Sequence, residues 1–286
     1  MKTQALHSVL YVPAINGKAL AKLPMLNMNA VIIDLEDAVH PDAKSDARAA
    51  MRSSLNAWTN RKALVAVRIN SLDSPFWLDD LKAAANASPH AIVLPKCETP
   101  QQVIALADAM GDLEMSDEIA IWAMIETPRA LFNIGAIAEL GHHNSNRLTC
   151  FIAGTNDLMK ETGVRDLAEM QPWLMQIVLA ARAGGLAVLD GVHNNIADSS
   201  GFENACLIAR NRGFDGKTLV HPSQIEPANR IFRPDNIEIG NARSIVRAFA
   251  LPENAAKSVI SLDGKMVERL HLEAAQTLLL KYNQTQ

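Results

Sequence analysis

The sequence predicts an α/β protein in which a (β/α)8 TIM barrel is followed by a C-terminal helix–hairpin–helix extension. Three observations indicate this fold: short apolar runs alternate with helical stretches, the runs number eight, and they lie about 20 to 38 residues apart, which leaves room for one helix in each gap. The runs cover residues 9–12, 30–33, 63–69, 91–94, 119–124, 148–152, 186–189 and 217–220. An open doubly wound sheet is the alternative, because a count of strands does not show closure.

Several helices between the runs are predicted to begin at a proline, which the first turn of a helix tolerates because its N–H groups have no partner inside the helix. Gly141 is expected to end the third of them. The prolines and the stretches that follow them are Pro41 with residues 42–48, Pro100 with residues 101–110, and Pro128 with residues 129–140.

The part of the chain beyond Pro234 departs from the barrel pattern. The dipeptide Asp263-Gly264 favours a type I′ turn and therefore a hairpin. The predicted elements are a helix over residues 236–250, hairpin strands over 257–262 and 265–267, and an amphipathic helix over about 268–281. We expect a catalytic barrel over residues 1–234 and an extension over residues 235–286, which could cover the barrel mouth or be exchanged with a neighbouring subunit.

Composition argues against several classes of protein. The chain has 286 residues, with 27 basic and 31 acidic side chains, and a formal net charge of −4 disfavours general attraction to nucleic acid or anionic lipid. Cys97, Cys150 and Cys206 form no CxxC pair, which disfavours a zinc cluster or a disulfide framework. No stretch reaches the ~18 apolar residues of a membrane span, and no signal peptide precedes the first run, so we expect a cytoplasmic protein.

Charged and polar residues follow nearly every apolar run. In a parallel barrel the carboxyl ends of the strands form one mouth, where the active site lies, so these residues are expected to converge. The segments are Asp34-Leu35-Glu36-Asp37, Arg68-Ile69-Asn70, Pro95-Lys96-Cys97-Glu98, Glu126-Thr127-Pro128-Arg129, Gly154-Thr155-Asn156-Asp157, Asp190-Gly191-Val192-His193 and His221-Pro222. A single aspartate in such a place is commonly only a helix cap, but Arg68 and Glu126 close fully apolar runs and need charged partners or a metal.

Glu126 and Asp157 predict a cation site. They end the neighbouring fifth and sixth runs without Cys or His ligands, which favours Mg²⁺ because this ion takes one or two carboxylates and completes its shell with water and substrate oxygens. A purely structural carboxylate pair is the alternative. Arg68 would hold a substrate carboxylate or a developing oxyanion, and a structural salt bridge to Glu36 or Asp37 is compatible with that role.

Other catalytic patterns are missing from the sequence. No GxSxG, P-loop or complete GxGxxG motif occurs, which disfavours a serine hydrolase, an NTPase and a Rossmann dehydrogenase. The eight histidines form no metal-ligand pattern. His221, at the end of the eighth run, is a candidate for the site, and a structural role for it is at least equally compatible with the sequence.

Seven motifs, in order along residues 7 to 250, carry a resemblance to a known family. They are Ser8-Val9-Leu10-Tyr11-Val12-Pro13, residues 34–39 with Pro41 and Lys44, Val67-Arg68-Ile69-Asn70, Leu94-Pro95-Lys96, Met124-Ile125-Glu126-Thr127-Pro128, Gly154-Thr155-Asn156-Asp157-Leu158, and Gly213-Phe214-Asp215-Gly216-Lys217 with His221-Pro222-Ser223-Gln224-Ile225. Together they resemble the citrate lyase β-subunit (CitE-like) family of the HpcH/HpaI aldolase superfamily. Malyl-CoA and citramalyl-CoA lyases are near relatives of that family.

The resemblance implies a magnesium-dependent barrel that makes or cleaves a carbon–carbon bond between an acyl-CoA thioester and a 2-oxo acid. It also implies a homo-oligomer, commonly a trimer or hexamer. The residue roles that it implies are Mg²⁺ binding by Glu126 and Asp157, substrate binding by Arg68 and Glu126, support of Arg68 by Glu36 and Asp37 at or beside the metal, and contacts of Lys18 and Lys44 with CoA phosphates.

The catalytic base is where this sequence departs from the family. Relatives often supply an aspartate in a Gly-x-Met-x-Asp pattern of the C-terminal segment, sometimes across a subunit boundary. Here the stretch reads Gly264-Lys265-Met266-Val267-Glu268. Glu268 could act as the base with altered reach, the activity could have changed, or Glu268 could be only an acid in the first turn of the last helix.

The leading hypothesis is a lyase that splits a 3-hydroxyacyl-CoA, such as citramalyl-CoA or malyl-CoA, into acetyl-CoA and a 2-oxo acid. One alternative is a malyl-CoA-type thioesterase, which would release free CoA. Another is a citrate lyase β subunit that acts on a carrier-bound citryl thioester. A non-catalytic relative that binds a metal or metabolite is the fourth.

Overall fold

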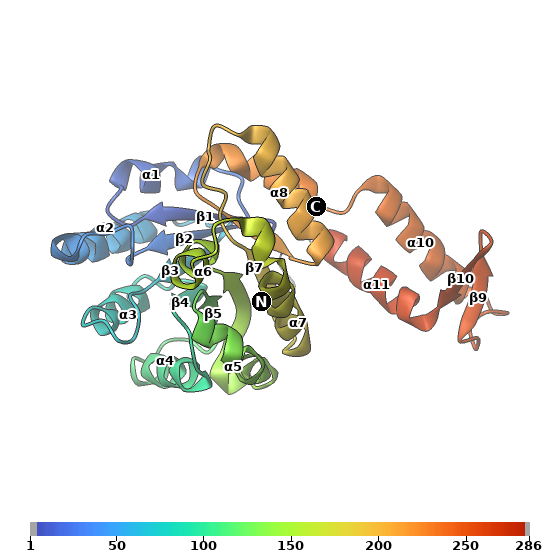
Figure 1. Cartoon of the computed structure of the whole chain (residues 1–286), viewed down its shortest axis with the longest axis horizontal. Coiled ribbons are helices and arrows are strands. Elements are labelled where there is room, and N and C mark those ends of the chain that lie inside the picture. The colour runs from blue at the N-terminus through green and yellow to red at the C-terminus, as the bar shows by residue number, and fades with distance from the viewer. Residues whose placement is uncertain (1–4, 284–286) are drawn as a thin grey trace. The chain divides into compact units, whose positions relative to one another are not determined.

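The computed structural model describes residues 5–283, and eight parallel strands close into a barrel in the order β1-β2-β3-β4-β5-β6-β7-β8 (Figure 1). Because β8 pairs with β1, the ring is closed, so the predicted (β/α)8 barrel is confirmed and the open sheet is wrong. The strands are β1 (Ser8–Pro13), β2 (Ala30–Asp34), β3 (Leu64–Arg68), β4 (Ala91–Leu94), β5 (Ala120–Ile125), β6 (Leu148–Ala153), β7 (Ala187–Asp190) and β8 (Gly216–Leu219).

Most strand residues are apolar because both faces of each strand are buried, and Lys217 and Thr218 of β8 are buried polar exceptions. Alternate side chains fill the inside of the barrel, and their neighbours along the strand, such as Leu10 and Ile33, pack beneath the helices. This double burial explains why the strands read as continuous apolar runs in the sequence. The interior is filled by residues that include Val9, Ile32, Ala66, Val93, Trp122 and Ile152.

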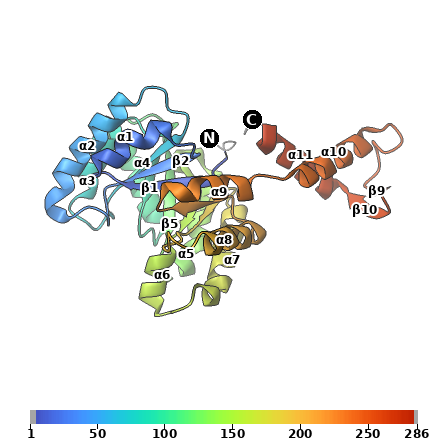
Figure 2. The ribbon, with the colours of Figure 1, turned by 90° about the horizontal axis from the view of Figure 1, so that it is seen from above.

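Helices surround the barrel; in Figure 2, α1, α2 and α3 lie on the outer side of β1 and β2. In the part of the chain that the structure describes, no helix is long and apolar enough to cross a membrane. The helices are α1 (Gly17–Lys22), α2 (Lys44–Ala57), α3 (Trp77–Ala85), α4 (Pro100–Asp112), α5 (Pro128–Glu139), α6 (Thr155–Thr162), α7 (Gln171–Ala183), α8 (Ser199–Arg212) and α9 (Ile225–Phe232).

Two predicted helix boundaries are wrong. The stretch expected to start the second helix first forms a 3₁₀ turn over Pro41–Ala43, and α2 begins only at Lys44. Gly141 does not end α5, because the helix stops at Glu139 and a 3₁₀ turn over Leu140–His142 carries the chain through the glycine. Gly141 is required for close packing instead, since a Cβ there would lie 2.4 Å from a backbone oxygen.

The chain divides after Phe232, and the segment that follows forms a small unit of its own. The turn at Asp263-Gly264 has positive φ at both residues, +50° and +75°, as a type I′ turn requires. The predicted helix–hairpin–helix order is confirmed. The elements are α10 (Asn236–Ala250), β9 (Val259–Leu262), β10 (Lys265–Glu268) and α11 (Arg269–Asn283), packed around Phe249, Ile260 and Val267.

Candidate active site

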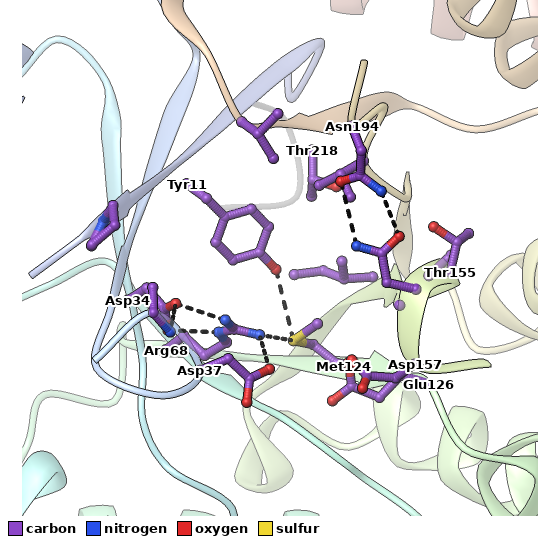
Figure 3. A pocket seen from close by; sticks show the side chains of 18 residues that line it. Tyr11, Asp34, Asp37, Arg68, Met124, Glu126, Thr155, Asp157, Asn194 and Thr218 are labelled. Carbon is purple, nitrogen blue, oxygen red and sulfur yellow. Dashed lines mark hydrogen bonds and ion pairs between the residues drawn. The ribbon is translucent and has the colours of Figure 1, made fainter. Parts of the chain in front are cut away.

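A pocket of about 410 Å³ lies at the carboxyl ends of the barrel strands (Figure 3). It is lined by residues within or directly after β1, β2, β3, β5, β6 and β8, and by the loop after β7. Four of the side chains singled out in the sequence, Asp37, Arg68, Glu126 and Asp157, lie in this one cavity. The expected convergence is therefore seen for the ends of β2, β3, β5 and β6, whereas the charged residues that follow β4, β7 and β8 do not line this pocket.

Arg68, the last residue of β3, is a buried cation held by several acids. Its Nε and Nη2 each donate to a carboxylate oxygen of Asp34 at 2.7 Å. Its Nη1 lies 3.0 Å from Glu36 Oε2 and 3.8 Å from Asp37 Oδ2. The guanidinium carbon also lies 5.1 Å from the centre of the Tyr11 ring. The two-point contact with Asp34 fixes the plane of the guanidinium and leaves Nη1 for other partners.

Asp34 is the main partner of Arg68, whereas the sequence had pointed to Glu36 or Asp37. Asp34 and Arg68 lie opposite each other in the register of β2 and β3, so an alignment of strand ends could have found the pair. Burial would raise the pKa of the Asp34 carboxyl, but the charge and hydrogen bonds of Arg68 outweigh it and hold the pKa below its ordinary value. Asp34 also accepts from the backbone N–H of Glu36 and Ala38, which orders the loop.

Glu126 is buried directly after β5, and its two carboxylate oxygens have different surroundings. Oε1 accepts the backbone N–H of Lys96 at 2.7 Å, whereas Oε2 is buried without a hydrogen-bond partner. Burial, followed by the charge of Glu36, raises the pKa of Glu126 to about 8. An ionised carboxylate in this position is costly unless a cation reaches it.

Asp157, in the first turn of α6, adds a second carboxylate, and its charge is among those that raise the pKa of Glu126 after burial and Glu36. Gly154 allows the start of α6 to pack closely against Glu126, because a Cβ at Gly154 would lie 2.3 Å from the Cβ of Glu126. Within residues 5–283 no group of three or more His, Cys, Asp or Glu side chains is arranged for a metal. Two carboxylates, one with an unpartnered oxygen, fit Mg²⁺ completed by water and substrate oxygens.

Glu36 and Lys96 connect the arginine with the carboxylate pair. Glu36 is buried, and its Oε1 lies 3.5 Å from the ammonium of Lys96. Burial raises the pKa of Glu36 to about 7 against the opposing charge of Arg68. Lys96 has a left-handed backbone with φ of +49°, a conformation that costs a residue other than glycine about 1–2 kcal/mol.

Lys44 was expected to meet a CoA phosphate, and its surroundings contradict this. The side chain is buried, and its ammonium donates to the backbone oxygens of Leu35 and Glu36, both at 2.7 Å, and to Asn70 Oδ1 at 2.9 Å. These three acceptors match the three protons of the ammonium, so no donor is left for a phosphate. Lys44 instead holds the loop that follows β2.

Lys18 and His221 are two further candidate residues from the sequence. Lys18 is exposed on α1, and its contact with CoA phosphates stays a prediction. His221 stands before a 3₁₀ turn, where its Nδ1 accepts the backbone N–H of Ser223 at 3.2 Å. His221 therefore caps this turn, which is a structural role of the kind that the sequence left open for it.

Glu268 lies in the second unit, at the end of β10. Because α11 begins at Arg269, Glu268 precedes the last helix, and the alternative that places it in the first turn is wrong. Its backbone N–H donates to Nδ1 of His271 at 2.9 Å, and its side chain is half-buried. The role of Glu268 as a base stays a prediction.

Two side chains of the pocket, Tyr11 and Asn194, were not among the candidate site residues that the sequence indicated. Tyr11 projects inward from β1, and its hydroxyl donates to Sδ of Met124 at 3.7 Å; burial raises the pKa of Tyr11 above its ordinary value. Asn194, after β7, donates to Oδ1 of Asn156 at 2.9 Å and thereby joins two loops at the pocket (Figure 3). The sequence signal for Tyr11 is the alternation of side chains along β1, because Tyr11 lies two residues after Val9 and therefore faces the inside of the barrel with it.

Comparison with known proteins places this chain in a family. Residues 7–222 match the model of the family described as HpcH/HpaI aldolase/citrate lyase. The chain is 40% identical to a (3S)-malyl-CoA thioesterase of Cereibacter sphaeroides over 277 residues, which cover 96% of this chain and 93% of the relative. It is 30% identical to the citrate lyase subunit beta of Leuconostoc mesenteroides subsp. cremoris over 280 residues, covering 95% and 91% of the two chains.

Solved structures share the fold of this chain over most of its length. CitE from Mycobacterium tuberculosis, in complex with magnesium, acetoacetate and coenzyme A, matches with a TM-score of 0.78 at 27% identity and covers 99% of this chain and 100% of its own. RipC from Yersinia pestis matches with a TM-score of 0.69 at 28% identity, over 83% of this chain and 99% of its own. The family indicated by the seven motifs is confirmed, and the chain belongs to the HpcH/HpaI aldolase/citrate lyase family.

Proposed function

We propose that this protein is a magnesium-dependent enzyme that cleaves the carbon–carbon bond of a 3-hydroxyacyl-CoA, such as malyl-CoA or citramalyl-CoA, to give acetyl-CoA and a 2-oxo acid. The observation that carries the proposal is one pocket lined together by Arg68, Asp157 and Glu126, with one oxygen of Glu126 buried and without a hydrogen-bond partner. A guanidinium beside a cation site suits a ligand that presents a carboxylate and an adjacent oxygen. CitE of M. tuberculosis, solved with magnesium, a small acid and coenzyme A, supports the same ligand classes here.

The residues divide the work of the cleavage. Arg68, oriented by Asp34, would bind the carboxylate of the oxo-acid half through Nη1. Glu126 and Asp157 would hold Mg²⁺, which when bound stabilises negative charge on the substrate oxygens as a Lewis acid. A base removes the hydroxyl proton, the carbon–carbon bond breaks, and the thioester enolate takes up a proton at carbon. We propose Glu268 as that base, from the position where relatives carry an aspartate.

A thioesterase is the second candidate, and the 40% identity with a (3S)-malyl-CoA thioesterase favours it. The same substrate would occupy the same pocket. Water would then attack the thioester carbonyl, the carbon–sulfur bond would break, and free CoA and the hydroxy acid would be released. Binding of the acid by Arg68 is common to both reactions, so only the products separate them.

The test is a product screen with the full-length protein and Mg²⁺. Malyl-CoA and citramalyl-CoA are supplied as free CoA esters, citryl thioester is supplied on an acyl carrier, and the products are identified by mass spectrometry. Acetyl-CoA together with glyoxylate or pyruvate is the expected result. Free CoA with the intact hydroxy acid would identify the thioesterase, and turnover confined to the carrier-bound ester would identify a citrate lyase subunit. Failure to convert any of them would contradict the proposal.

The oligomeric state is a further part of the proposed function. We propose a cytoplasmic homo-oligomer, a trimer or hexamer, on the strength of the family resemblance. Light scattering of the purified protein measures this state directly, and a monomeric mass would exclude it.

A further inference from the structure

Lys96 occupies an unusual place in the loop after β4. Its φ of +49° lies in a region that glycine enters freely and other residues rarely adopt. In this conformation its backbone N–H donates to Glu126 Oε1 at 2.7 Å. Glycine would provide the same N–H without the conformational cost. A lysine at this position therefore indicates that its side chain has a use of its own.

The ammonium of Lys96 reaches the acid that faces Arg68. It lies 3.5 Å from Glu36 Oε1, and the other oxygen of Glu36 lies 3.0 Å from Nη1 of Arg68. Two cations therefore share one buried carboxylate. Nη1 is also the nitrogen that the hydrogen bonds to Asp34 leave free. Whatever competes for Nη1 decides how well Arg68 can bind a second anion.

We propose that Lys96 is a positioning residue whose ammonium draws the charge of Glu36 away from Arg68, and so keeps Nη1 available to the carboxylate of a 2-oxo acid. This inference rests on the proposed Mg²⁺ and 2-oxo acid site. The charges of the pocket support it, because acids outnumber cations there and each lost cation strengthens the hold of the remaining acids on Arg68. The acids are Asp34, Glu36, Asp37, Glu126 and Asp157.

Removal of the ammonium should change the two ligands in opposite directions. Lys96→Met retains the backbone N–H to Glu126 but leaves the site more negative, so Mg²⁺ should bind with the same or a higher affinity. Pyruvate must then displace an unshared Glu36 from Arg68, and its dissociation constant should rise by roughly tenfold or more. A merely structural role would weaken both ligands together.

The experiment measures binding of Mg²⁺, and of pyruvate in the presence of Mg²⁺, by calorimetry on the full-length protein. Lys96→Gly also lacks the ammonium but relaxes the left-handed backbone, so it separates loss of charge from strain and safeguards against a variant that does not fold. Lys82→Met is the control, since Lys82 pairs with Asp79 at 3.7 Å on the exposed side of α3. Both Lys96 variants should lose pyruvate affinity, and the control should match the wild type. Glu36→Gln added to Lys96→Met should restore pyruvate binding toward the wild-type value.

Several outcomes would overturn the inference. They are wild-type pyruvate affinity in either Lys96 variant, a parallel loss of Mg²⁺ affinity in both, or no rescue by Glu36→Gln. A wild-type protein that binds no pyruvate would overturn the inference as well. A wild-type protein that binds both ligands but converts no thioester would refute only the proposed function, because the Lys96 measurement does not depend on turnover.

Discussion

A guanidinium buried as deeply as that of Arg68 is stable only when its protons meet acceptors. Asp34 supplies two of them, and the carboxylate of Glu36 faces the third side. The sequence identified Arg68 as an anion-binding residue because it closes an apolar strand. It did not identify Asp34 as the main partner, because Asp34, Glu36 and Asp37 lie within one stretch of four residues and only the register of β2 and β3 distinguishes them.

Arg68→Lys should lower kcat/KM for the active thioester by about 10²-fold. A lysine cannot hold both oxygens of Asp34 and still offer a flat donor edge to a substrate carboxylate. Steady-state kinetics measure the effect. Arg48→Lys is the matched control, because Arg48 binds a buried acid, Asp80, at 2.9 Å outside the pocket. The control should lose stability but keep kcat/KM, and an unaltered kcat/KM in Arg68→Lys would remove Arg68 from substrate binding.

At the scale of elements, the predictions succeeded where local chemistry decides and failed where packing does. Helices α4 and α5 begin at Pro100 and Pro128 as expected, because proline fits the first turn whatever surrounds it. Helix α2 begins later than expected, at Lys44. That side chain is drawn into the protein by backbone oxygens of the loop after β2, a contact between segments that no local pattern reveals.

The junction of β6 and α6 gives a test at this scale. Gly154→Ala would bring a methyl group to 2.5 Å from the unpartnered Oε2 of Glu126. We expect the free energy of unfolding to fall by about 1–3 kcal/mol, as for other overpacked sites, and Mg²⁺ binding to weaken because the carboxylate must move.

Gly111→Ala serves as the control for this substitution, because a Cβ there meets nothing within 4 Å on α4. It should be neutral or stabilise the protein by roughly 0.5–1 kcal/mol. Chemical denaturation and calorimetry measure both quantities. Wild-type Mg²⁺ affinity in Gly154→Ala would show that the close approach to Glu126 does not position the metal ligand.

At the scale of the whole molecule, the barrel is closed by a contact between segments at opposite ends of its sequence. Ser8 of β1 lies beside Lys217 of β8, and this pairing brings the ends of all eight strands to one mouth. The unpartnered carboxylate of Glu126 in that mouth lowers the free energy of unfolding of the whole domain. A ligand that pairs with this carboxylate should therefore stabilise the fold globally.

Mg²⁺ should raise the melting temperature of the wild-type protein. Saturation to about 100 times Kd adds about 2.7 kcal/mol, which corresponds to several degrees for a chain of this size. Glu126→Gln should abolish the shift. It should also leave the metal-free protein at least as stable as the wild type, because burial disfavours the charged carboxylate and the amide carries no charge.

Differential scanning calorimetry with and without Mg²⁺ checks this expectation, with Glu139→Gln as a control on the exposed side of α5. The control should keep the full shift. An equal shift in Glu126→Gln would place the metal elsewhere.

The sequence by itself determined the number of strands, their parallel arrangement, the C-terminal helix–hairpin–helix, the family, and a short set of candidate residues. These properties follow from periodicity, turn chemistry and residue type, which act within a few residues. Only the tertiary structure decided closure, the pairing of Arg68 with Asp34, the structural use of Lys44 and the link through Lys96. Each of these depends on strand register or on contacts between distant segments, which are set by the packing of the whole barrel.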